Sequence, residues 1–395
     1  MHIDLNAVVD YFYKATWRIG MSASKKLAAK ITLAGAVVAW SGIAEAQSSV
    51  TLSGVIDTGI MYSNNNGGHA SWSTINGLLT PTRWILSGTE DLGGGTRAIF
   101  RLINPFSVQN GRNTGRAFNV AYVGLSNNHY GTLTFGRQYD TTLDFLYIYA
   151  VSNTWAHVGD SDNTNGSFKV SNAVKYLSPN WAGLQLGATY GFSNESGQFK
   201  NNRQMSTGAT YAYGPFSASL GVEQLDHPDS QPAGAVGTAG GGTADDYGTL
   251  MFAQSVVNHA SVARQRIWLA GTSYRIGHVT IDGLYSKVQY KYIDGTGLTL
   301  DNYLAYLQWQ IAPYLSTQLA YIHTNGNYSG VPSKIRNPGW DQINIGGQYL
   351  LSKRTFIYAI AVGQQGRNAN AQILNLSPSS TRRQLAVVLG VQHQF

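Results

Sequence analysis

The chain contains no cysteine, and only 12% of its 395 residues are charged. Low charge would suit membrane-spanning helices, yet beyond residue 46 the sequence has no uninterrupted apolar run of about 18 or more residues. Transmembrane helices are therefore excluded for that part of the chain. The lack of cysteine is compatible with an oxidising compartment such as the periplasm, where stray thiols would react. The formal net charge is +7, but the basic residues are scattered and form no nucleic-acid-binding run.

Apolar and polar side chains alternate instead. Near the C-terminus, Leu389 and Phe395 share one side of an extended strand, whereas Gln392 lies on the other side. Segments 341–351 and 302–311 repeat the pattern. Forty-five glycines, 24 tyrosines and 9 tryptophans fit closely packed strands with aromatic belts at two membrane interfaces. This alternation predicts strands with one side toward lipid and the other toward a hydrated interior.

The connections between these strands alternate in length. Seven short ones are expected at residues 90–96, 127–131, 178–183, 213–216, 276–279, 311–315 and 351–354. Eight longer ones are expected at residues 64–81, 107–116, 139–171, 194–203, 226–263, 292–300, 325–339 and 365–381. Fifteen connections join sixteen strands. The sequence thus predicts an all-β fold, a closed 16-stranded antiparallel transmembrane β-barrel with short periplasmic turns and long extracellular loops. A barrel of this size would enclose a passive, water-filled pore.

The beginning of the chain is expected to lie outside the barrel. Residues 21–46 have the features of a signal peptide, because lysines precede an apolar stretch that ends in Ala-Glu-Ala. Residues 1–20 add nothing to that signal, so we expect translation to begin at Met21. Residues 47–395 then form the barrel domain, which would be exported through the periplasm to the cell outer membrane.

Charged residues on the strands indicate which side faces water. An arginine facing lipid at the middle of the bilayer costs about 2–4 kcal/mol. By alternation with apolar neighbours, the following side chains are expected to face the lumen: Asp57, Arg83, Arg97 and Arg101. Arg137 shares its side with the apolar Phe135, so a β-bulge or a strand end near Gly136 would be needed to turn it inward.

Several stretches resemble the general (non-specific) trimeric porins of β-proteobacteria. They are AQSSVTLSGVIDTGI at residues 46–60, RWILSGTEDLGGGTRAIF at 83–100, AYVGLSNNHYGTLTFGRQYDTTLDF at 121–145, and the terminal Phe395. The resemblance implies a sixteen-stranded barrel, a homotrimer, and a third long loop folded into the lumen as a constriction. It also implies that Phe395 is a recognition signal for the barrel-insertion machinery. The expected function is passive transport of ions and small hydrophilic solutes, with no catalytic residue, cofactor or metal. Outer-membrane lipid and lipopolysaccharide are the other expected partners.

The same resemblance places a pore constriction between basic wall residues and acidic loop residues. The expected basic wall residues are Arg83, Arg97, Arg101 and Arg137, the expected acidic loop residues are Asp140 and Asp144, and Asp57 and Ser87 are expected on the lumen wall. Ser87 stands where the family usually has arginine or lysine, and Arg101 and Ile103 stand where glutamine and glutamate are usual. These departures add one positive charge to the wall and predict a mild anion preference. Because Asp160 and Asp162 could also line the loop, a weak cation preference is the alternative.

Other interpretations compete with a general pore. The third loop contains four aromatic residues at close spacing: Phe145, Tyr147, Tyr149 and Trp155. They could form a sugar-binding track, but the favoured interpretation is that they anchor the loop to the wall. Residues 160–166 resemble a calcium loop, but the required glycine and glutamate are out of register. A lipid-facing hydrolase site would need a serine near His393, which that strand lacks. The fifth loop, residues 226–263, is expected to be exposed and could bind a partner as a receptor or adhesin.

Overall fold

A computed structural model describes residues 48–150, 157–231, 233–237 and 247–395. The proposed signal peptide and start site lie outside these residues. Strands dominate the described chain, and no helix within it is long and apolar enough to cross a membrane. The four short helices of this described part are α2 (Thr141–Leu146), η1 (Tyr147–Tyr149), η2 (Val158–Asp160) and η3 (Tyr247–Thr249).

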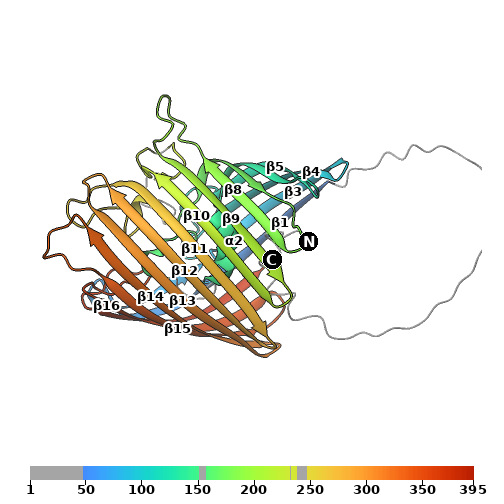
Figure 1. The fold of residues 1–395 in the computed structure, drawn as a ribbon. Coiled ribbons are helices and arrows are strands. Elements are labelled where there is room, and N and C mark those ends of the chain that lie inside the picture. The colour runs from blue at the N-terminus through green and yellow to red at the C-terminus, as the bar shows by residue number, and fades with distance from the viewer. Residues whose placement is uncertain (1–47, 151–156, 232, 238–246) are drawn as a thin grey trace, which may run out of the picture.

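The strands form one antiparallel sheet that closes on itself (Figure 1). In chain order they are β1 (Ser49–Asn66), β2 (His69–Asn76), β3 (Arg83–Gly93), β4 (Thr96–Pro105), β5 (Val120–Asn127), β6 (Gly131–Gln138), β7 (Val170–Leu177), β8 (Leu184–Gly191), β9 (Arg203–Tyr213), β10 (Phe216–Asp226), β11 (Val262–Ile276), β12 (Val279–Tyr292), β13 (Gly297–Ala312), β14 (Leu315–Ser329), β15 (Gly339–Leu350), β16 (Thr355–Arg367) and β17 (Arg383–Gln394). From β3 onward each strand pairs with the next, and β1 closes the barrel against β17.

The barrel has sixteen strand positions although seventeen strands are named. Both β2 and β3 pair with β1, β3 along its first half and β2 along its second half. They therefore occupy one position, interrupted at residues 77–82. The prediction of a closed 16-stranded antiparallel barrel is confirmed.

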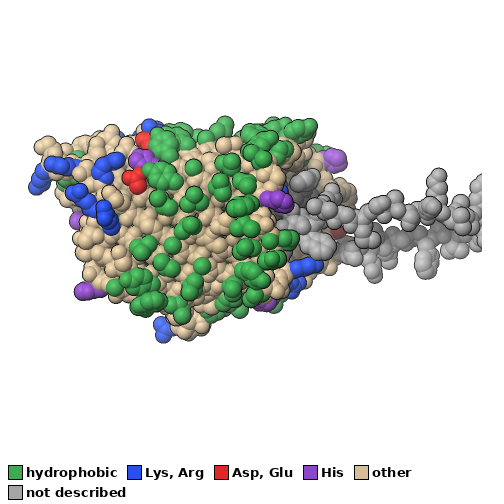
Figure 2. All heavy atoms as spheres, turned by 90° about the horizontal axis from the view of Figure 1, so that it is seen from below, with side chains coloured by type: hydrophobic (Ala, Val, Ile, Leu, Met, Phe, Trp, Pro, Cys, Tyr) green, Lys and Arg blue, Asp and Glu red, His purple; other side chains and the backbone are tan. Residues whose placement is uncertain are grey.

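The outer surface carries the apolar side chains that the alternation predicts. On β17, Leu385, Leu389 and Val391 are 41%, 64% and 39% exposed, while Gln384 and Gln392 are buried. Figure 2 shows hydrophobic side chains spread over the outside of the barrel, with most of the visible lysine and arginine side chains toward one end. Because exposed apolar side chains on so many strands would be unfavourable in water, this surface fits lipid.

Two predicted connections are wrong. The segment at 64–81 contains the hairpin between β1 and β2, which turns at Gly67 and Gly68, both with positive φ. The predicted long loop at 292–300 is a short turn between β12 and β13, since strand pairing already joins Lys291 to Gly297. In both places, residues that were expected to form a polar loop belong to a strand instead.

The interior is more packed than a simple wet channel. Apolar residues of the third and fifth loops form a buried cluster with strands β7 and β10–β13. Within the fifth loop Val236, Tyr247 and Phe252 are buried, whereas Gln254, Val256 and His259 are exposed, so the expectation of an exposed loop holds for only part of its described residues. Across the barrel, Ile373 and Leu376 of the last loop cover the inner side of β16 and β17. Lumen-facing amides such as Gln384 therefore bond to loop backbone instead of facing only water.

Candidate pore and its constriction

The third loop, residues 139–169, begins with the helix α2 (Figure 1). Asp140 caps the helix, since its carboxylate accepts the backbone N–H of Leu143 at 2.8 Å. Five of the six helical residues are buried, and α2 contacts β8, β9, β10 and β11. A helix of this length is too short to be stable alone, so these contacts with the wall hold it in place.

Polar side chains on the inner side of the wall bind this loop. The contacts run from β8 to β10: Thr141 with Thr189 at 2.8 Å, the Thr141 backbone N–H with Ser206 at 3.1 Å, and the Tyr149 hydroxyl with Ser219 at 3.0 Å. These wall residues alternate with exposed apolar residues of the same strands. These contacts hold the described part of the loop against the inner side of the wall.

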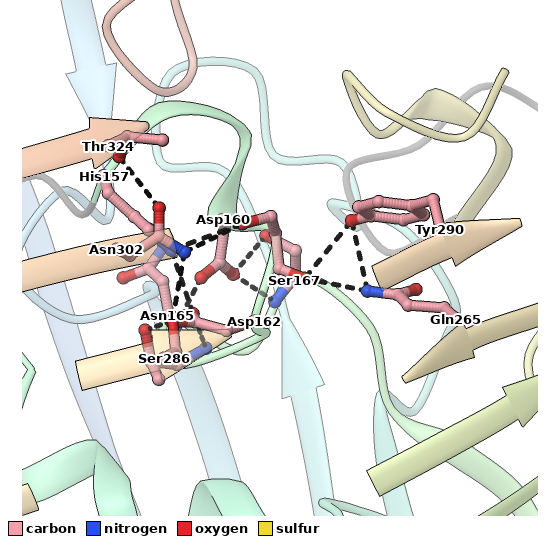
Figure 3. A network of polar contacts seen from close by, with 12 residues as sticks. His157, Asp160, Asp162, Asn165, Ser167, Gln265, Ser286, Tyr290, Asn302 and Thr324 are labelled. Carbon is pink, nitrogen blue, oxygen red and sulfur yellow. Dashed lines mark hydrogen bonds and ion pairs between the residues drawn. The ribbon is translucent and has the colours of Figure 1, made fainter. Parts of the chain in front are cut away.

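Further along, the loop is anchored by a buried network around Asp162 (Figure 3). One carboxylate oxygen of Asp162 lies 3.2 Å from His157 Nε2, and the other accepts the hydroxyl of Ser286 on β12. Asn302 on β13 donates to Ser161 at 3.3 Å, and Gln265 on β11 donates to the Ser161 carbonyl at 2.8 Å. The loop is therefore fixed to three successive strands at this point.

The charges of this network perturb one another. Burial would lower the pKa of His157, but the charges of Asp162 and Asp160 outweigh it and raise that pKa above its ordinary value. Burial would raise the pKa of Asp162, but His157 and hydrogen bonds hold it at about 2. Burial and the Asp162 charge raise the pKa of Asp160 to about 6. His157 and Asp162 thus form a buried ion pair.

One possible ligand atom from each of His157, Asp160 and Asp162 lies within 4.8 Å of the other two, close enough for all three to bind one metal ion. Their carboxylate oxygens already accept bonds from the chain, however. Asp160 accepts the backbone N–H groups of Asn165 and Ser167 at 2.9 and 3.2 Å. Because these bonds order the loop without an ion, we assign the cluster to anchoring.

The aromatic residues of the loop divide between anchoring and the lumen. Phe145 and Tyr149 are buried against the wall, which agrees with the anchoring interpretation. Tyr147 is only partly buried, and Trp155 lies outside the described residues. These positions provide no continuous exposed aromatic track among the described residues.

Arg83 on β3 and Arg101 on β4 lie on the inner side of the wall, next to the start of the third loop. Each shares its side with a buried isoleucine, Ile85 or Ile103, and these two pack with Tyr139 of the loop. Burial raises the pKa of Tyr147 in the third loop above its ordinary value. The positive charge of Arg83 acts in the opposite direction, so Arg83 is close to the loop. The two arginines therefore lie on the wall beside the third loop.

Neither arginine is neutralised by the described protein. Within residues 48–150, 157–231, 233–237 and 247–395, no hydrogen-bond acceptor or carboxylate pairs with the guanidinium of Arg83 or Arg101. Arg101 is 9% exposed and its Nε is enclosed without a partner. A buried guanidinium without a protein partner needs water or an anion nearby.

The other two predicted wall arginines are placed differently. Arg97 is the second residue of β4, beside a short turn, and its guanidinium bonds to Asn128 at 3.4 Å. It is four residues from Arg101, or about 13 Å along the strand. Arg137 follows Gly136 at a shift of register between β6 and β7, one residue before β6 ends at Gln138. Its guanidinium donates to the Ser171 hydroxyl at 2.7 Å.

The predicted acidic and neutral wall residues are mostly enclosed. Asp140 is 0% exposed and binds Asn163 at 2.9 Å besides capping α2. Asp144 pairs with Lys175 on β7. Asp57 is also 0% exposed, because residues 77–82 cover it and its carboxylate accepts the Leu79 N–H at 2.8 Å. Ser87 lies directly opposite Arg101 in the sheet.

Lys175, which the sequence did not single out, binds the third loop from β7. It alternates with Val174 and with the exposed Tyr176, a pattern that already indicates an inward side chain. Ser286 and Asn302 on the wall bind residues 161 and 162 of the third loop. Both side chains are uncharged, so the sequence pattern does not distinguish them from other polar wall residues.

Comparison with known proteins identifies the family. A profile of the Gram-negative porins matches residues 32–369. The chain belongs to this family. It is 29% identical to an outer membrane porin protein of Bordetella pertussis, over 93% of this chain and the whole of that protein. It is also 29% identical to outer membrane porin protein 32 of Delftia acidovorans, over 93% of this chain and 99% of that protein.

Solved structures share the fold. An anion-selective porin from Comamonas acidovorans superposes with a TM-score of 0.71 at 22% identity, covering 88% of this chain and all of that one. OmpT of Vibrio cholerae in its trimer form gives 0.66 at 13% identity, covering 88% and 99%. The protein is thus an outer-membrane β-barrel porin whose strands cross the membrane, and its family and fold indicate a channel for passive diffusion.

Proposed function

We propose that this porin is a general diffusion pore with a weak preference for anions, and that its narrow section lies between the third loop and the wall formed by β3 and β4. The observation that carries the proposal is that the basic wall residues lack protein partners while the acidic loop residues have them. Arg83 and Arg101 have no carboxylate partner among the described residues, whereas Asp140 and Asp144 are held by the helix cap and by Lys175. The field at the wall beside Arg83 and Arg101 is then positive.

The size of this preference follows from Coulomb's law. One charge at about 10 Å in water contributes about 0.4 kcal/mol, which is below thermal energy. Low-dielectric walls focus the field, so two arginines acting together bias ion passage without binding any one solute tightly. The porin from Comamonas acidovorans is described as anion-selective, which supports the same sign here.

The remaining parts of the proposal rest on the family. We propose a homotrimer in contact with outer-membrane lipid and lipopolysaccharide, made from a precursor that begins at Met21 and is cleaved after Ala46. Phe395 would be read by the barrel-insertion machinery, and its partly exposed ring at the end of the chain supports this. We also propose that the protein acts by sieving and electrostatics, with no catalytic residue or cofactor.

The test is the reversal potential of the purified protein in a planar bilayer under a salt gradient. The proposal predicts stepwise conductance and a small reversal potential on the anion side. Conductance with a cation-side potential would overturn the anion preference. A correctly folded protein without conductance would overturn the open pore itself.

A further inference from the structure

A row of apolar side chains lies between the two unpaired arginines of the wall. Strand pairing places Ile85 of β3 opposite Ile103 of β4, and Ile103 opposite Val120 of β5. Arg83 precedes Ile85 by two residues, and Arg101 precedes Ile103 by two residues. Because β3 and β4 are antiparallel, one arginine begins on each side of the row, about 7 Å away along its strand. Positive and apolar groups therefore alternate along this part of the wall.

Three tyrosine side chains gather at the same place. Tyr122 of β5 and Tyr139 of the third loop pack against the apolar row, and Tyr122 lies opposite Arg101 in the sheet. Arg83 and Tyr139 both act electrostatically on Tyr147 of the loop, so these three lie near one another. All three tyrosines are half-buried, which leaves part of each accessible from the lumen. The following side chains are called the tyrosine-arginine patch below: Arg83, Arg101, Tyr122, Tyr139 and Tyr147.

The described residues next to the patch add positive charge or none. The ammonium of Lys169 lies 5.8 Å from the centre of the Tyr139 ring. Ser87 and Pro105, which pair across the sheet with the two arginines, are uncharged. The carboxylate of Asp140, the residue after Tyr139, is fully buried and caps α2. A solute in the narrow section therefore meets positive charge and aromatic rings together.

We propose that the tyrosine-arginine patch binds aromatic carboxylates as they pass through the pore. A guanidinium donates paired N–H groups to a carboxylate, and its planar face stacks on aromatic rings. A solute ring also packs on the tyrosine rings, whereas a compact anion offers only its charge. The inference rests on the proposed anion preference and names the class of solute that the narrow section favours.

The binding is weak by the nature of a pore. A solute must enter the narrow section and also leave it, so a site on its path holds the solute only briefly. One aromatic contact is expected to raise the affinity about tenfold over that for a carboxylate without a ring. The patch thus selects among anions of equal charge without closing the pore.

The test is block of the chloride current through the purified protein in a planar bilayer. Potassium benzoate is added to both sides in potassium chloride at neutral pH, and potassium acetate is the compact anion of the same charge. Benzoate is expected to halve the current at about one tenth of the acetate concentration. Benzamide has the ring but no charge, and it is expected to leave the current unchanged.

Variants of Tyr147 test the ring contact. In Tyr147→Leu the benzoate concentration that halves the current is expected to rise several-fold, while Tyr147→Phe keeps the ring and retains the wild-type value. Tyr122→Leu on β5 makes the same comparison without a change in the loop. The control is Tyr211→Leu, which removes a ring from the lipid-facing side of β9, where Tyr211 is 41% exposed, and is expected to match the wild type.

Several results would overturn the proposal. Equal block by benzoate and acetate would show that the ring is not recognised, and equal block by benzamide would show that the charge is not. Wild-type benzoate values in both Tyr147→Leu and Tyr122→Leu would remove the tyrosines from the site. An equal rise in Tyr211→Leu would show an unspecific effect.

The reversal potential of the same membranes under a salt gradient tests the proposed function separately. A cation-side potential would overturn the anion preference itself. An anion-side potential together with equal block by benzoate and acetate would overturn only the site for aromatic carboxylates.

Discussion

The ammonium nitrogen of Lys175 on β7 lies 2.5 Å from a carboxylate oxygen of Asp144 in α2, and both side chains are only 7% exposed. This pair joins the third loop to the wall. It also neutralises an acid that the sequence assigned to the constriction. The loop therefore contributes less negative charge to the lumen than its composition predicts.

Breaking this pair is expected to loosen the loop. In Lys175→Met, Asp144 stays buried without its partner, and removal of one member of a buried pair costs about 3–5 kcal/mol. The double variant Lys175→Met/Asp144→Leu is expected to recover most of that loss, because no uncompensated charge is left. Chemical denaturation in detergent measures the free energy of unfolding of both variants. A double variant as unstable as the single one would contradict a paired role.

The double variant also tests the sign of the lumen charge. Since the pair carries no net charge, its removal is expected to leave the reversal potential unchanged. A clear shift toward anions would show that Asp144 acts on permeating ions, as the sequence predicted.

The network around His157 predicts a pH dependence of the loop anchor. The raised pKa of Asp160, about 6, means that the folded state holds more protons than the unfolded state between about pH 4 and pH 6. The raised pKa of His157 has the same effect above about pH 6.5. Both make the anchor weaker as pH rises. The lowered pKa of Asp162 matters only below about pH 4.

The pH dependence of the loop anchor can be measured by hydrogen exchange of residues 157–169, corrected for the intrinsic effect of pH on the exchange rate. Protection in the wild type is expected to fall between about pH 5 and pH 8. In His157→Gln the part of the fall above about pH 6.5 is expected to vanish. Protection that increases with pH over this range would refute the ion-pair assignment.

Closure of the barrel depends on a small residue at Gly54. Its backbone exchanges two hydrogen bonds of 3.0 Å with Phe395, and a Cβ placed there would lie 2.3 Å from the Phe395 ring and 2.7 Å from the Arg83 carbonyl. Gly54→Ala is expected to destabilise the barrel by about 1–3 kcal/mol. Gly363→Ala is the control, because a Cβ there meets nothing within 4 Å. Equal unfolding midpoints for the two variants would contradict this contact.

Alternation of side chains was enough to predict the barrel and the outward side of β17, and the alternating lengths of the connections predicted the strand number. It worked because lipid and water impose opposite requirements on successive residues. It did not predict where loops fold back. Asp57 has the same pattern as an open lumen residue, yet residues 77–82 cover it. Such contacts depend on side chains distant in sequence, such as Tyr358, which donates to Asp57 at 2.7 Å.

The inward side of two wall arginines was predictable for the same reason. The pattern places Arg83 and Arg101 inward, as the structure does. No pattern indicates that Asp140 would cap a helix or that Lys175 would reach Asp144. Charge balance in the lumen is set by these pairings, so composition alone left the ion preference open.

The most direct test of an anion preference set at the constriction is the reversal potential of Arg101→Glu, with Arg97→Glu as its control. The two arginines lie on the same side of β4, but only Arg101 is beside the third loop, while Arg97 lies next to a short turn. We expect Arg101→Glu to move the reversal potential toward cations and Arg97→Glu to move it much less. Equal shifts, or no shift for Arg101→Glu, would contradict an anion preference set by unpaired arginines at the constriction.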